Sequence, residues 1–227
     1  MRVVSWNCNA GFAAKIDAVL GLRPDILVVQ EISRAHFEAL SLPSTSGIWT
    51  GNERRGLAVI SLQGDALRVD PLFDPSLPHF LPIHLGDFRM LATWASVRTS
   101  TQRYVRLMHL ALDHYRYFLP AERGIIIGDL NSATVFDRKH GDLNHTTLVE
   151  KLAKQGYVSL WHHHECEDHG SESRPTFYMY RRAQQTWHLD YAFLSSDLLS
   201  GASIEIGLPD IWLQVSDHMP LVVNINV

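Results

Sequence analysis

The chain has 227 residues, of which 46% are hydrophobic and 19% charged, and it carries a formal net charge of −4 and two cysteines. This composition is typical of a globular protein with a sizeable core, and it excludes a disulfide-built scaffold and a protein that coats nucleic acid by bulk positive charge. No apolar run reaches bilayer-spanning length and no secretory signal opens the chain, so we expect a cytoplasmic protein without stable membrane association. Because no linker or repeat interrupts the sequence, residues 1–227 are expected to form a single domain.

The apolar pattern predicts many short strands with few helices between them. Strands are expected at 2–7, 26–30, 57–62, 88–97, 103–110, 124–128, 157–161, 176–180, 187–194 and 221–227. Helices are expected at 13–20, at 35–40 and after the capping residue Asn144, and the proline-rich segment 71–82 is expected to be an irregular connection. This succession indicates two packed sheets with helices outside, rather than a regular alternation of parallel strands and helices.

A carboxylate and a carboxamide follow the most apolar strand directly. Three isoleucines precede Gly128, and Asp129 and Asn131 come next. Side chains two residues apart at a strand end lie on the same side of the backbone, so both polar groups can reach one point at the rim of a sheet. Taken alone, the pair is better explained by an Asx turn that only terminates the strand, because a strand followed by Gly-Asp is common turn chemistry.

The same arrangement recurs elsewhere in the chain. Asn7, Glu31 and His109 each stand at the end of a predicted strand, and Asp217 and His218 precede the last one. Each case has a structural explanation of its own; His109, for example, fits a buried core histidine. Together, so many carboxylates, carboxamides and imidazoles are costly to gather unless a hard cation and a charged substrate occupy the site.

These residues lie in motifs through which the sequence resembles the endonuclease/exonuclease/phosphatase superfamily of metal-dependent phosphoesterases. The motifs, in the family's order, are Ser-Trp-Asn-Cys-Asn at 5–9, Val-Gln-Glu at 29–31, Gly-Asp-Leu-Asn at 128–131, Leu-Asp-Tyr at 189–191 and Ser-Asp-His-Met-Pro at 216–220. The resemblance implies an α/β four-layer sandwich, in which two central mixed β-sheets pack face to face with helices outside. It places the site at one edge of this sandwich.

The resemblance also implies a divalent-metal site. In that family the residue matching Glu31 is the main ligand of Mg²⁺ or Mn²⁺, helped by the residues matching Asn7 and Asp217. The ion stabilises the charge that builds up during displacement at phosphorus. The cofactor expected from the resemblance is therefore Mg²⁺ or Mn²⁺.

Five further positions are assigned catalytic roles by the same resemblance. The residue matching Asp129 positions or deprotonates the attacking water, and the match to Asn131 contacts the phosphate. His218 would contact a phosphoryl oxygen or move a proton, oriented by Asp190. Where His109 falls, apurinic-site endonucleases carry Tyr; a histidine there is similar to the pancreatic-deoxyribonuclease and sphingomyelinase branches, where it can protonate the leaving oxygen.

Basic residues beside the motifs favour a nucleic-acid substrate. Arg54, Arg55, Arg181 and Arg182 are expected to bind the phosphate backbone, with Asn9 as a further substrate contact. We therefore expect a monomeric metal-dependent nuclease that hydrolyses DNA or RNA with little sequence preference. The alternatives are a phosphatase or phosphodiesterase acting on an inositol phosphate or sphingomyelin type of substrate, and a catalytically inactive binding module with the same fold.

The segment 162–169, His-His-His-Glu-Cys-Glu-Asp-His, suggests a different kind of site. The chain contains 13 histidines, which makes a search for metal sites worthwhile. The candidate ligands His162, His164, Cys166 and His169 lack the paired spacing of structural zinc sites. A solvated loop is therefore favoured, and a zinc-binding interaction protein is kept as an alternative.

Overall fold

The computed structural model describes residues 1–43, 46–97, 104–119 and 122–226, which contain two large mixed sheets and a small ribbon. The first sheet contains, in spatial order, β13 (Ala202–Ile206), β14 (Leu221–Ile225), β1 (Arg2–Asn7), β2 (Ile26–Ile32), β4 (Arg55–Ser61) and β3 (Gly47–Asn52). The second contains β5 (Leu67–Val69), β6 (Phe80–Leu85), β7 (Phe88–Trp94), β8 (Gly124–Asp129), β12 (Asp190–Ser195) and β9 (Tyr157–Ser159). The ribbon consists of β10 (Phe177–Tyr178) and β11 (Thr186–Trp187).

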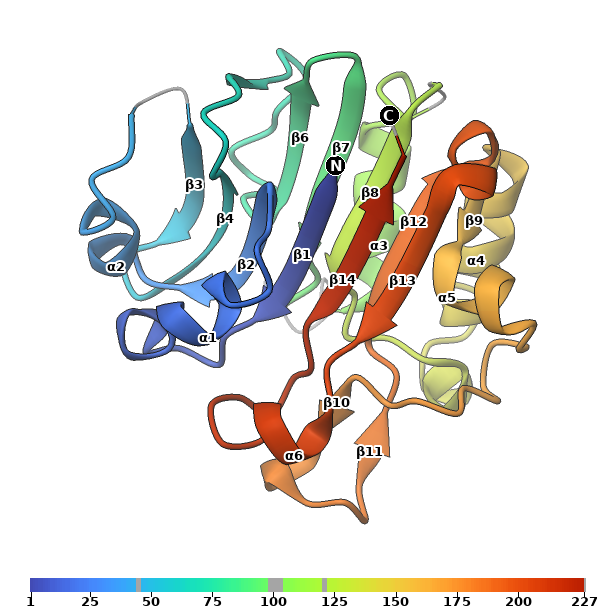
Figure 1. Cartoon of the computed structure of the whole chain (residues 1–227). Coiled ribbons are helices and arrows are strands. Elements are labelled where there is room, and N and C mark those ends of the chain that lie inside the picture. Colours follow the sequence, from blue (N-terminus) through green and yellow to red (C-terminus); the bar gives the residue numbers. More distant parts are fainter. Residues whose placement is uncertain (44–45, 98–103, 120–121, 227) are drawn as a thin grey trace.

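Helices flank the two sheets, which pack face to face (Figure 1). The α-helices are α1 (Ile16–Leu20), α2 (Arg34–Glu38), α3 (Val105–His114), α4 (His145–Lys154), α5 (Leu160–Glu165) and α6 (Pro209–Trp212). Short 3₁₀ helices occur at η1 (Phe12–Ala14), η2 (Thr134–Lys139), η3 (Met179–Arg181) and η4 (Ser196–Gly201). The predicted sandwich of two mixed sheets with helices outside is confirmed. None of the helices in the described ranges is long and apolar enough to cross a membrane.

The isoleucines of β8 show how the second sheet is covered on both faces. Ile125 and Ile127 belong to the core between the two sheets, whereas Ile126 belongs to a second core beneath α3 and α4. A strand with apolar cover on both faces needs no alternation of polar and apolar residues. Burying each such side chain contributes roughly 1.5–3 kcal/mol, so β8 is a firmly anchored strand.

The strand directions bring several chain segments to one edge of the sandwich. β1 runs parallel to β2, and β7 runs parallel to β8. β12 pairs antiparallel with β8 so that Asp190 lies opposite Asp129. β14 pairs antiparallel with β1, so the segment before β14 lies beside the end of β1. The carboxyl ends of β1, β2 and β8 therefore meet the start of β12 and the segment before β14.

The predicted strand at 103–110 is wrong, because the described part of this segment lies in helix α3. The buried side chains Val105, Met108, Ala111 and Leu112 recur at helical spacing and face the second core. Within the shorter window, Val105, Leu107 and His109 also alternate, which imitates a strand. The helical period becomes apparent only when the segment is extended to His114.

Two other expectations about secondary structure are corrected. The segment 71–82 was expected to be irregular, but β6 begins at Phe80 and includes Pro82. Pro82 lies just beyond the last pair between β5 and β6, where its carbonyl accepts a bond from the Asp70 amide and no donor is needed. The solvated loop expected at 162–169 begins instead inside α5, and His162 is buried.

The approach of β7 to β8 requires glycine at Gly128. Its φ is 146°, and an added Cβ would overlap the backbone oxygen of Thr93 on β7. Gly64 also has a positive φ, of 83°, but an added Cβ there would meet no atom within 4 Å.

We therefore expect Gly128→Ala to lower the free energy of unfolding by at least about 2 kcal/mol more than Gly64→Ala, which carries only the backbone penalty of roughly 1–2 kcal/mol. Urea unfolding of the two variants measures the difference. Equal losses would show that the two strands can separate at this point without cost.

Candidate active site

The amide of Asn7 joins carboxylates from both sheets. Asn7 ends β1, and its Nδ2 donates to Glu31 Oε1 at 3.3 Å and to Asp129 Oδ2 at 3.0 Å. Glu31 belongs to β2 of the first sheet, whereas Asp129 ends β8 of the second. Asn7 and Asp129 are buried. One side chain therefore fixes the distance between two acidic groups that are far apart in the sequence.

Asp129 is held by the loop that follows its strand. Its Oδ1 accepts a hydrogen bond from the Asn131 amide nitrogen at 2.8 Å, and its Oδ2 accepts one from Asn131 Nδ2 at 2.9 Å. Asn131 makes the first of these bonds in a left-handed backbone conformation, with φ of 47°. Burial raises the pKa of Asp129, against the opposing charge of His218 and the hydrogen bonds from Asn7 and Asn131. Asp129 is therefore a stronger base than an ordinary aspartate.

Glu31 is presented to the same edge by a β-bulge. Gln30 pairs with Leu57 and Ile32 pairs with Gly56, so Glu31 is the extra residue of β2. Its φ is 63°, a conformation that is uncommon for residues other than glycine. Bulges of this kind redirect a side chain, and strained backbone conformations cluster at functional sites. The bulge thus turns the carboxylate toward the end of the sheet.

His218 and Asp190 form a buried pair beside Asp129. His218 Nδ1 lies 2.9 Å from Asp190 Oδ2, and Thr176 Oγ1 accepts a hydrogen bond from the Asp190 amide. Burial alone would lower the pKa of His218, but the charges of Asp190 and Asp129 outweigh it and raise the pKa well above the usual range. His218 is therefore an imidazolium at neutral pH, with Nδ1–H directed at Asp190.

Two arrangements of these side chains could hold a cation. Donor atoms of Asp129, Asp190 and His218 lie within 4.8 Å of one another. A protonated His218 that already donates to Asp190 is unsuited to bind metal, so we interpret this group as a hydrogen-bonded unit. Glu31 Oε2 and Asp217 Oδ1 are the better donors, because both are buried oxygens without a hydrogen-bond partner in the described structure. Carboxylate oxygens of this kind suit hard cations such as Mg²⁺ and Mn²⁺.

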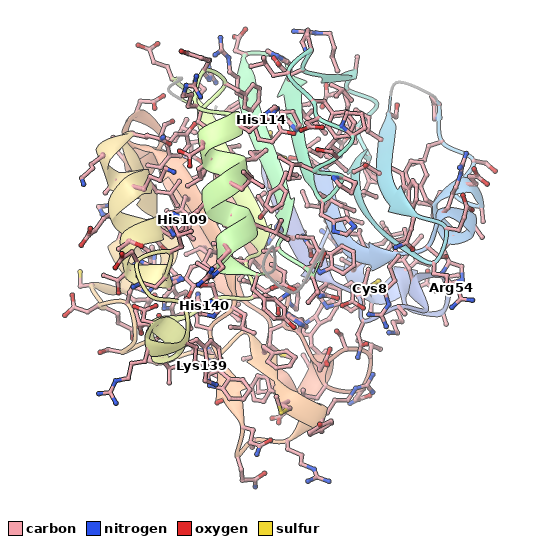
Figure 2. The ribbon with its side chains drawn as sticks, turned by 180° about the vertical axis from the view of Figure 1, so that it is seen from behind. Cys8, Arg54, His109, His114, Lys139 and His140 are labelled. Atoms are coloured by element: carbon pink, nitrogen blue, oxygen red, sulfur yellow. The ribbon has the colours of Figure 1, made fainter. Side chains whose placement is uncertain are left out.

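A groove of about 700 Å³ opens next to this cluster. Its walls include the rings of Phe136, Phe177 and Trp187, and the cations Arg106 and Lys139 also line it. The Phe136 and Trp187 ring centroids lie 5.5 Å apart, and those of Phe177 and Trp187 lie 6.0 Å apart. Figure 2 shows Lys139 beyond the lower end of α3. The groove therefore offers an aromatic wall with positive charge beside it.

Phe177 connects this groove to the acidic edge. Its ring centroid lies 4.7 Å from that of His218, and the two residues form an isolated β-bridge. Asn131 also lines the groove. A ligand that fills the groove would therefore contact Asn131, which bonds to Asp129, and Phe177, which packs against His218.

A second hollow, of about 380 Å³, lies on the other side of Asn131. Glu31, His79 and Trp94 line it, and the His79 and Trp94 ring centroids are 4.3 Å apart. His79 Nδ1 lies 2.6 Å from Ser96 Oγ, and burial lowers the pKa of His79 to about 4, so the ring is neutral. No pattern in the sequence indicates His79, because it lies in the proline-rich segment for which an irregular connection is expected.

His109 does not belong to the cluster, contrary to the prediction. It lies on α3, where its Nε2 is 3.0 Å from the carbonyl oxygen of Asn144, the residue that caps α4. Figure 2 shows His109 midway along α3 on the side of α4. His109 therefore lies apart from the residues proposed for catalysis, and we assign it no role in protonating a leaving group. The predicted separation from relatives that carry Tyr rested on His109 and is not retained.

The four predicted arginines occupy different environments. Arg55 Nη1 lies 3.0 Å from Glu31 Oε2, as an ion pair that does not have the geometry of a hydrogen bond. Arg181 donates to the carbonyl oxygens of Gln214 at 3.3 Å and Val215 at 3.4 Å. Arg54 and Arg182 are exposed, and Figure 2 shows Arg54 at the margin of the molecule. Only Arg55 contacts an acidic residue of the cluster in the described structure.

The loop after β1 is organised by a lysine that sequence reasoning missed. Lys15 Nζ donates to the carbonyl oxygens of Cys8 at 2.6 Å and Ala10 at 2.8 Å. The Asn9 amide nitrogen donates to Asn7 Oδ1 at 3.0 Å, which fixes the orientation of the Asn7 amide. Asn9 thus supports the cluster through its backbone. Lys15 was missed because it contributes through backbone carbonyls, which carry no sequence motif.

Comparison with known proteins gives one family and several similar structures. The sequence model described as Endonuclease/Exonuclease/phosphatase family matches residues 4–218, whereas no curated protein sequence matches the chain. A 3′-5′ exonuclease from Neisseria meningitidis is 19% identical, with a TM-score of 0.71 and both chains covered in full. An AP endonuclease from Archaeoglobus fulgidus is 18% identical, with a TM-score of 0.70 and the same coverage. The endonuclease domain of the telomere-specific retrotransposon TRAS1 is 16% identical, with a TM-score of 0.67 and coverage of 99% of this chain and 97% of that one.

The left-handed backbone of Glu31 allows strain and chemistry to be separated. Glu31→Ala and Glu31→Gly both remove the carboxylate, but only glycine adopts a φ of 63° without a steric penalty. We expect Glu31→Gly to be more stable than Glu31→Ala by about 1 kcal/mol in urea unfolding. A Glu31→Ala variant as stable as Glu31→Gly would mean that the bulge relaxes when the side chain is removed.

Proposed function

Because the chain belongs to the endonuclease/exonuclease/phosphatase family and is a phosphoric ester hydrolase, we propose that it hydrolyses the phosphodiester bonds of DNA or RNA in a reaction that depends on Mg²⁺ or Mn²⁺. The observation that carries this proposal is the convergence of Asn7, Glu31, Asp129 and the Asp190–His218 pair at an edge that adjoins an aromatic groove. The neighbours that are called an exonuclease and an AP endonuclease support a nucleic-acid substrate.

Glu31 and Asp217 would hold the divalent cation. Each has a buried carboxylate oxygen without a hydrogen-bond partner in the described residues, and such an oxygen is costly to bury unless a cation compensates it. Arg55 Nη1, 3.0 Å from Glu31 Oε2, already compensates the Glu31 oxygen in part, so Asp217 Oδ1 is the oxygen that most needs a bound cation. When bound there, the cation supplies a Lewis acid that stabilises negative charge on the phosphoryl oxygens. Asn7 would support this site indirectly, because its Nδ2 holds Glu31 Oε1 in place.

Asp129 would orient the attacking water and accept its proton. A carboxylate has about four lone-pair sites, and the bonds from Asn7 and Asn131 occupy three of them. One site is left for a water molecule. The raised pKa brings Asp129 closer to neutral pH, where a general base works best. Asn131, whose Nδ2 donates to Asp129 Oδ2, would contact the phosphate next to this carboxylate.

His218 would donate a hydrogen bond to a phosphoryl oxygen. Its Nδ1–H is directed at Asp190, so Nε2–H is the donor that remains for the substrate. No group in the described ranges forms a hydrogen bond with Nε2. Because Asp190 keeps the ring protonated and oriented, the positive charge is in place before the substrate binds. Asp190 acts only through His218 in this account.

The groove supports a polymer as the substrate. Stacking of a base on an aromatic side chain contributes about 1–3 kcal/mol and is tolerant of sequence, which fits a nuclease with little sequence preference. Arg106 and Lys139 would attract the phosphate backbone. An inositol phosphate would leave part of a groove of about 700 Å³ unused.

We also propose that residues 1–227 act as one domain and as a monomer in the cytoplasm. Support for the single domain comes from the first sheet, in which β1 near the start of the chain pairs with β14 near its end. Neither sheet can form from one half of the sequence alone. Size-exclusion chromatography with light scattering measures the oligomeric state.

Metal dependence is the first requirement of the proposal. EDTA should abolish hydrolysis, and Mg²⁺ or Mn²⁺ should restore it. Glu31→Gln should lower kcat by at least about 10²-fold, because an electrostatic contact in the transition state is lost. The matched control Glu205→Gln, an exposed position on β13, should retain full activity.

The substrates to be compared are plasmid DNA, single-stranded DNA, abasic duplex, RNA, an inositol phosphate and sphingomyelin. The proposal predicts cleavage of one or more of the nucleic acids. Full activity in EDTA would contradict the metal dependence, and cleavage of only the last two would contradict the nucleic-acid substrate.

The aromatic groove should matter for polymers and not for small esters. Phe136→Leu and Trp187→Leu remove stacking surface without touching His218, so they should raise KM for a polynucleotide roughly tenfold. Hydrolysis of a bis(nitrophenyl) phosphate should change less than twofold. Tyr117→Leu, at an exposed aromatic outside the groove, is the control. Equal losses on both substrates would show that these rings support the fold rather than bind bases.

A further inference from the structure

A second cluster of ligand-type side chains lies outside the machinery described above. One ring nitrogen each of His162 and His169 and one carboxylate oxygen of Glu172 lie within 4.8 Å of one another. The side chains of His162 and Glu172 are only 7% and 9% exposed. His162 comes from α5, whereas His169 and Glu172 come from the segment 166–176, which has no regular secondary structure between α5 and β10. The cluster therefore joins a helix to a long irregular segment.

Hydrogen bonds aim the donor atoms of this cluster at one another. His162 Nδ1 lies 2.7 Å from Ser159 Oγ, which leaves Nε2 facing Glu172 Oε1 at 3.2 Å. The Gly170 amide donates to the same Glu172 oxygen at 2.9 Å. The rings of His162 and His169 stack with centroids 3.5 Å apart and an interplanar angle of 15°. The two imidazoles are therefore packed directly against each other beside the carboxylate.

A second layer of partners holds His169. His145 Nε2 lies 3.2 Å from His169 Nδ1, and His145 Nδ1 lies 3.0 Å from Ser132 Oγ. Among the described residues, no hydrogen bond uses His169 Nε2. Histidines that bind metals nearly always use the other ring nitrogen for a hydrogen bond of this kind, which fixes the ring and its tautomer. His162 and His169 both fit this arrangement.

Glu172 is a largely buried carboxylate without a basic partner other than imidazole in the described structure. His162 Nε2 and the Gly170 amide are its neighbours at hydrogen-bond distance, and no lysine or arginine in the described ranges forms an ion pair with it. A carboxylate whose side chain is only 9% exposed is costly to bury unless a cation compensates its charge.

We propose that His162, His169 and Glu172 bind a Zn²⁺ ion. Two imidazole nitrogens and one carboxylate oxygen form a known zinc ligand set, and imidazole favours zinc over magnesium. Bonds of about 2.0–2.2 Å place tetrahedral ligands roughly 3.3 Å apart, and the His162–Glu172 separation of 3.2 Å matches this spacing. The site differs in donor chemistry from the cation site proposed at the acidic edge, where the donors of Glu31 and Asp217 are carboxylate oxygens.

The ion would fasten the segment 166–176 to the body of the protein. Through His145 and Ser132 the cluster also contacts the residue that follows Asn131. The ring of His188, two residues before Asp190, lies 5.7 Å from that of His162. Zinc at this point would therefore brace both loops that carry the acidic edge without contacting the substrate.

The proposed zinc ligands differ in part from those considered from the sequence: His162 and His169 are kept, and Glu172 takes the place of His164 and Cys166. His164 is exposed and its Nδ1 lies 2.8 Å from Glu165 Oε1, and Cys166 is exposed with its sulfur near the His163 carbonyl oxygen. Neither contributes to the cluster. Glu172 was missed because it lies beyond the histidine-rich stretch. His164 and Cys166 now serve as controls that belong to the same stretch.

Metal analysis of the purified full chain tests the proposal. The protein is loaded with Zn²⁺, dialysed against metal-free buffer and measured by mass spectrometry for metal content. We expect one zinc per chain in the wild type and in His164→Asn and Cys166→Ser. Glu172→Gln and His169→Asn should each retain less than a tenth of this zinc. Replacement of Zn²⁺ by Co²⁺ should give the visible d–d absorption of a tetrahedral site in the wild type, His164→Asn and Cys166→Ser. Glu172→Gln and His169→Asn should lack this absorption.

A thermal-shift measurement and the zinc content of further variants decide the cases in which a ligand variant does not fold. If Glu172→Gln or His169→Asn fails to fold, the thermal shift of the wild type decides: a Tm that does not rise on adding Zn²⁺ to chelator-treated protein overturns the proposal. A wild type without zinc, or zinc lost from Cys166→Ser but kept in Glu172→Gln, also overturns it. Glu31→Gln should keep its zinc, so loss of catalysis and loss of this site are separate results.

Discussion

The hydrogen bonds from the Asn7 amide to Glu31 and Asp129 hold the candidate site together, because they connect the ends of strands from two different sheets. Neither sheet alone brings the proposed cation site next to the proposed general base. The packing of the two sheets sets the distance between the carboxylates, and the amide then neutralises part of their repulsion. The Asn9 backbone amide in turn fixes the Asn7 side chain. The chemistry proposed for this edge depends on that one side chain and on the core that keeps the sheets in contact.

Rigid strands also explain how unfavourable backbone conformations persist at this edge. Glu31 and Asn131 both have positive φ angles, of 63° and 47°, and each follows a fully buried strand segment. The strain is roughly 1–2 kcal/mol for each residue, and the buried isoleucines of β8 contribute more than this to the strand that carries Asp129. The second cluster, around Glu172, has no strand of its own to support it. A bound ion would supply there the rigidity that the sheets supply at the acidic edge.

The sequence was sufficient to predict the sandwich and the side chains that end strands, because apolar runs followed by polar residues report strand ends directly. It gave Asn7, Glu31 and Asp129 for this reason. The prediction for His109 failed, because apolar and polar residues of a helix can alternate over a short stretch of sequence and so imitate a strand. His79 and Lys15 were missed, because both come from loops whose place in the fold depends on tertiary packing. The aromatic groove likewise arises from rings on separate segments and has no pattern in the sequence.

The proposed reaction requires a divalent cation at Glu31 and Asp217 while Asp190 and His218 remain a hydrogen-bonded pair. Anomalous diffraction from crystals of the protein soaked in Mn²⁺ locates such a cation. We expect a manganese peak within about 2.5 Å of a Glu31 carboxylate oxygen, with the His218 Nδ1–Asp190 hydrogen bond intact. A peak enclosed by Asp129, Asp190 and His218, or no peak near Glu31 at saturating Mn²⁺, would contradict the proposal.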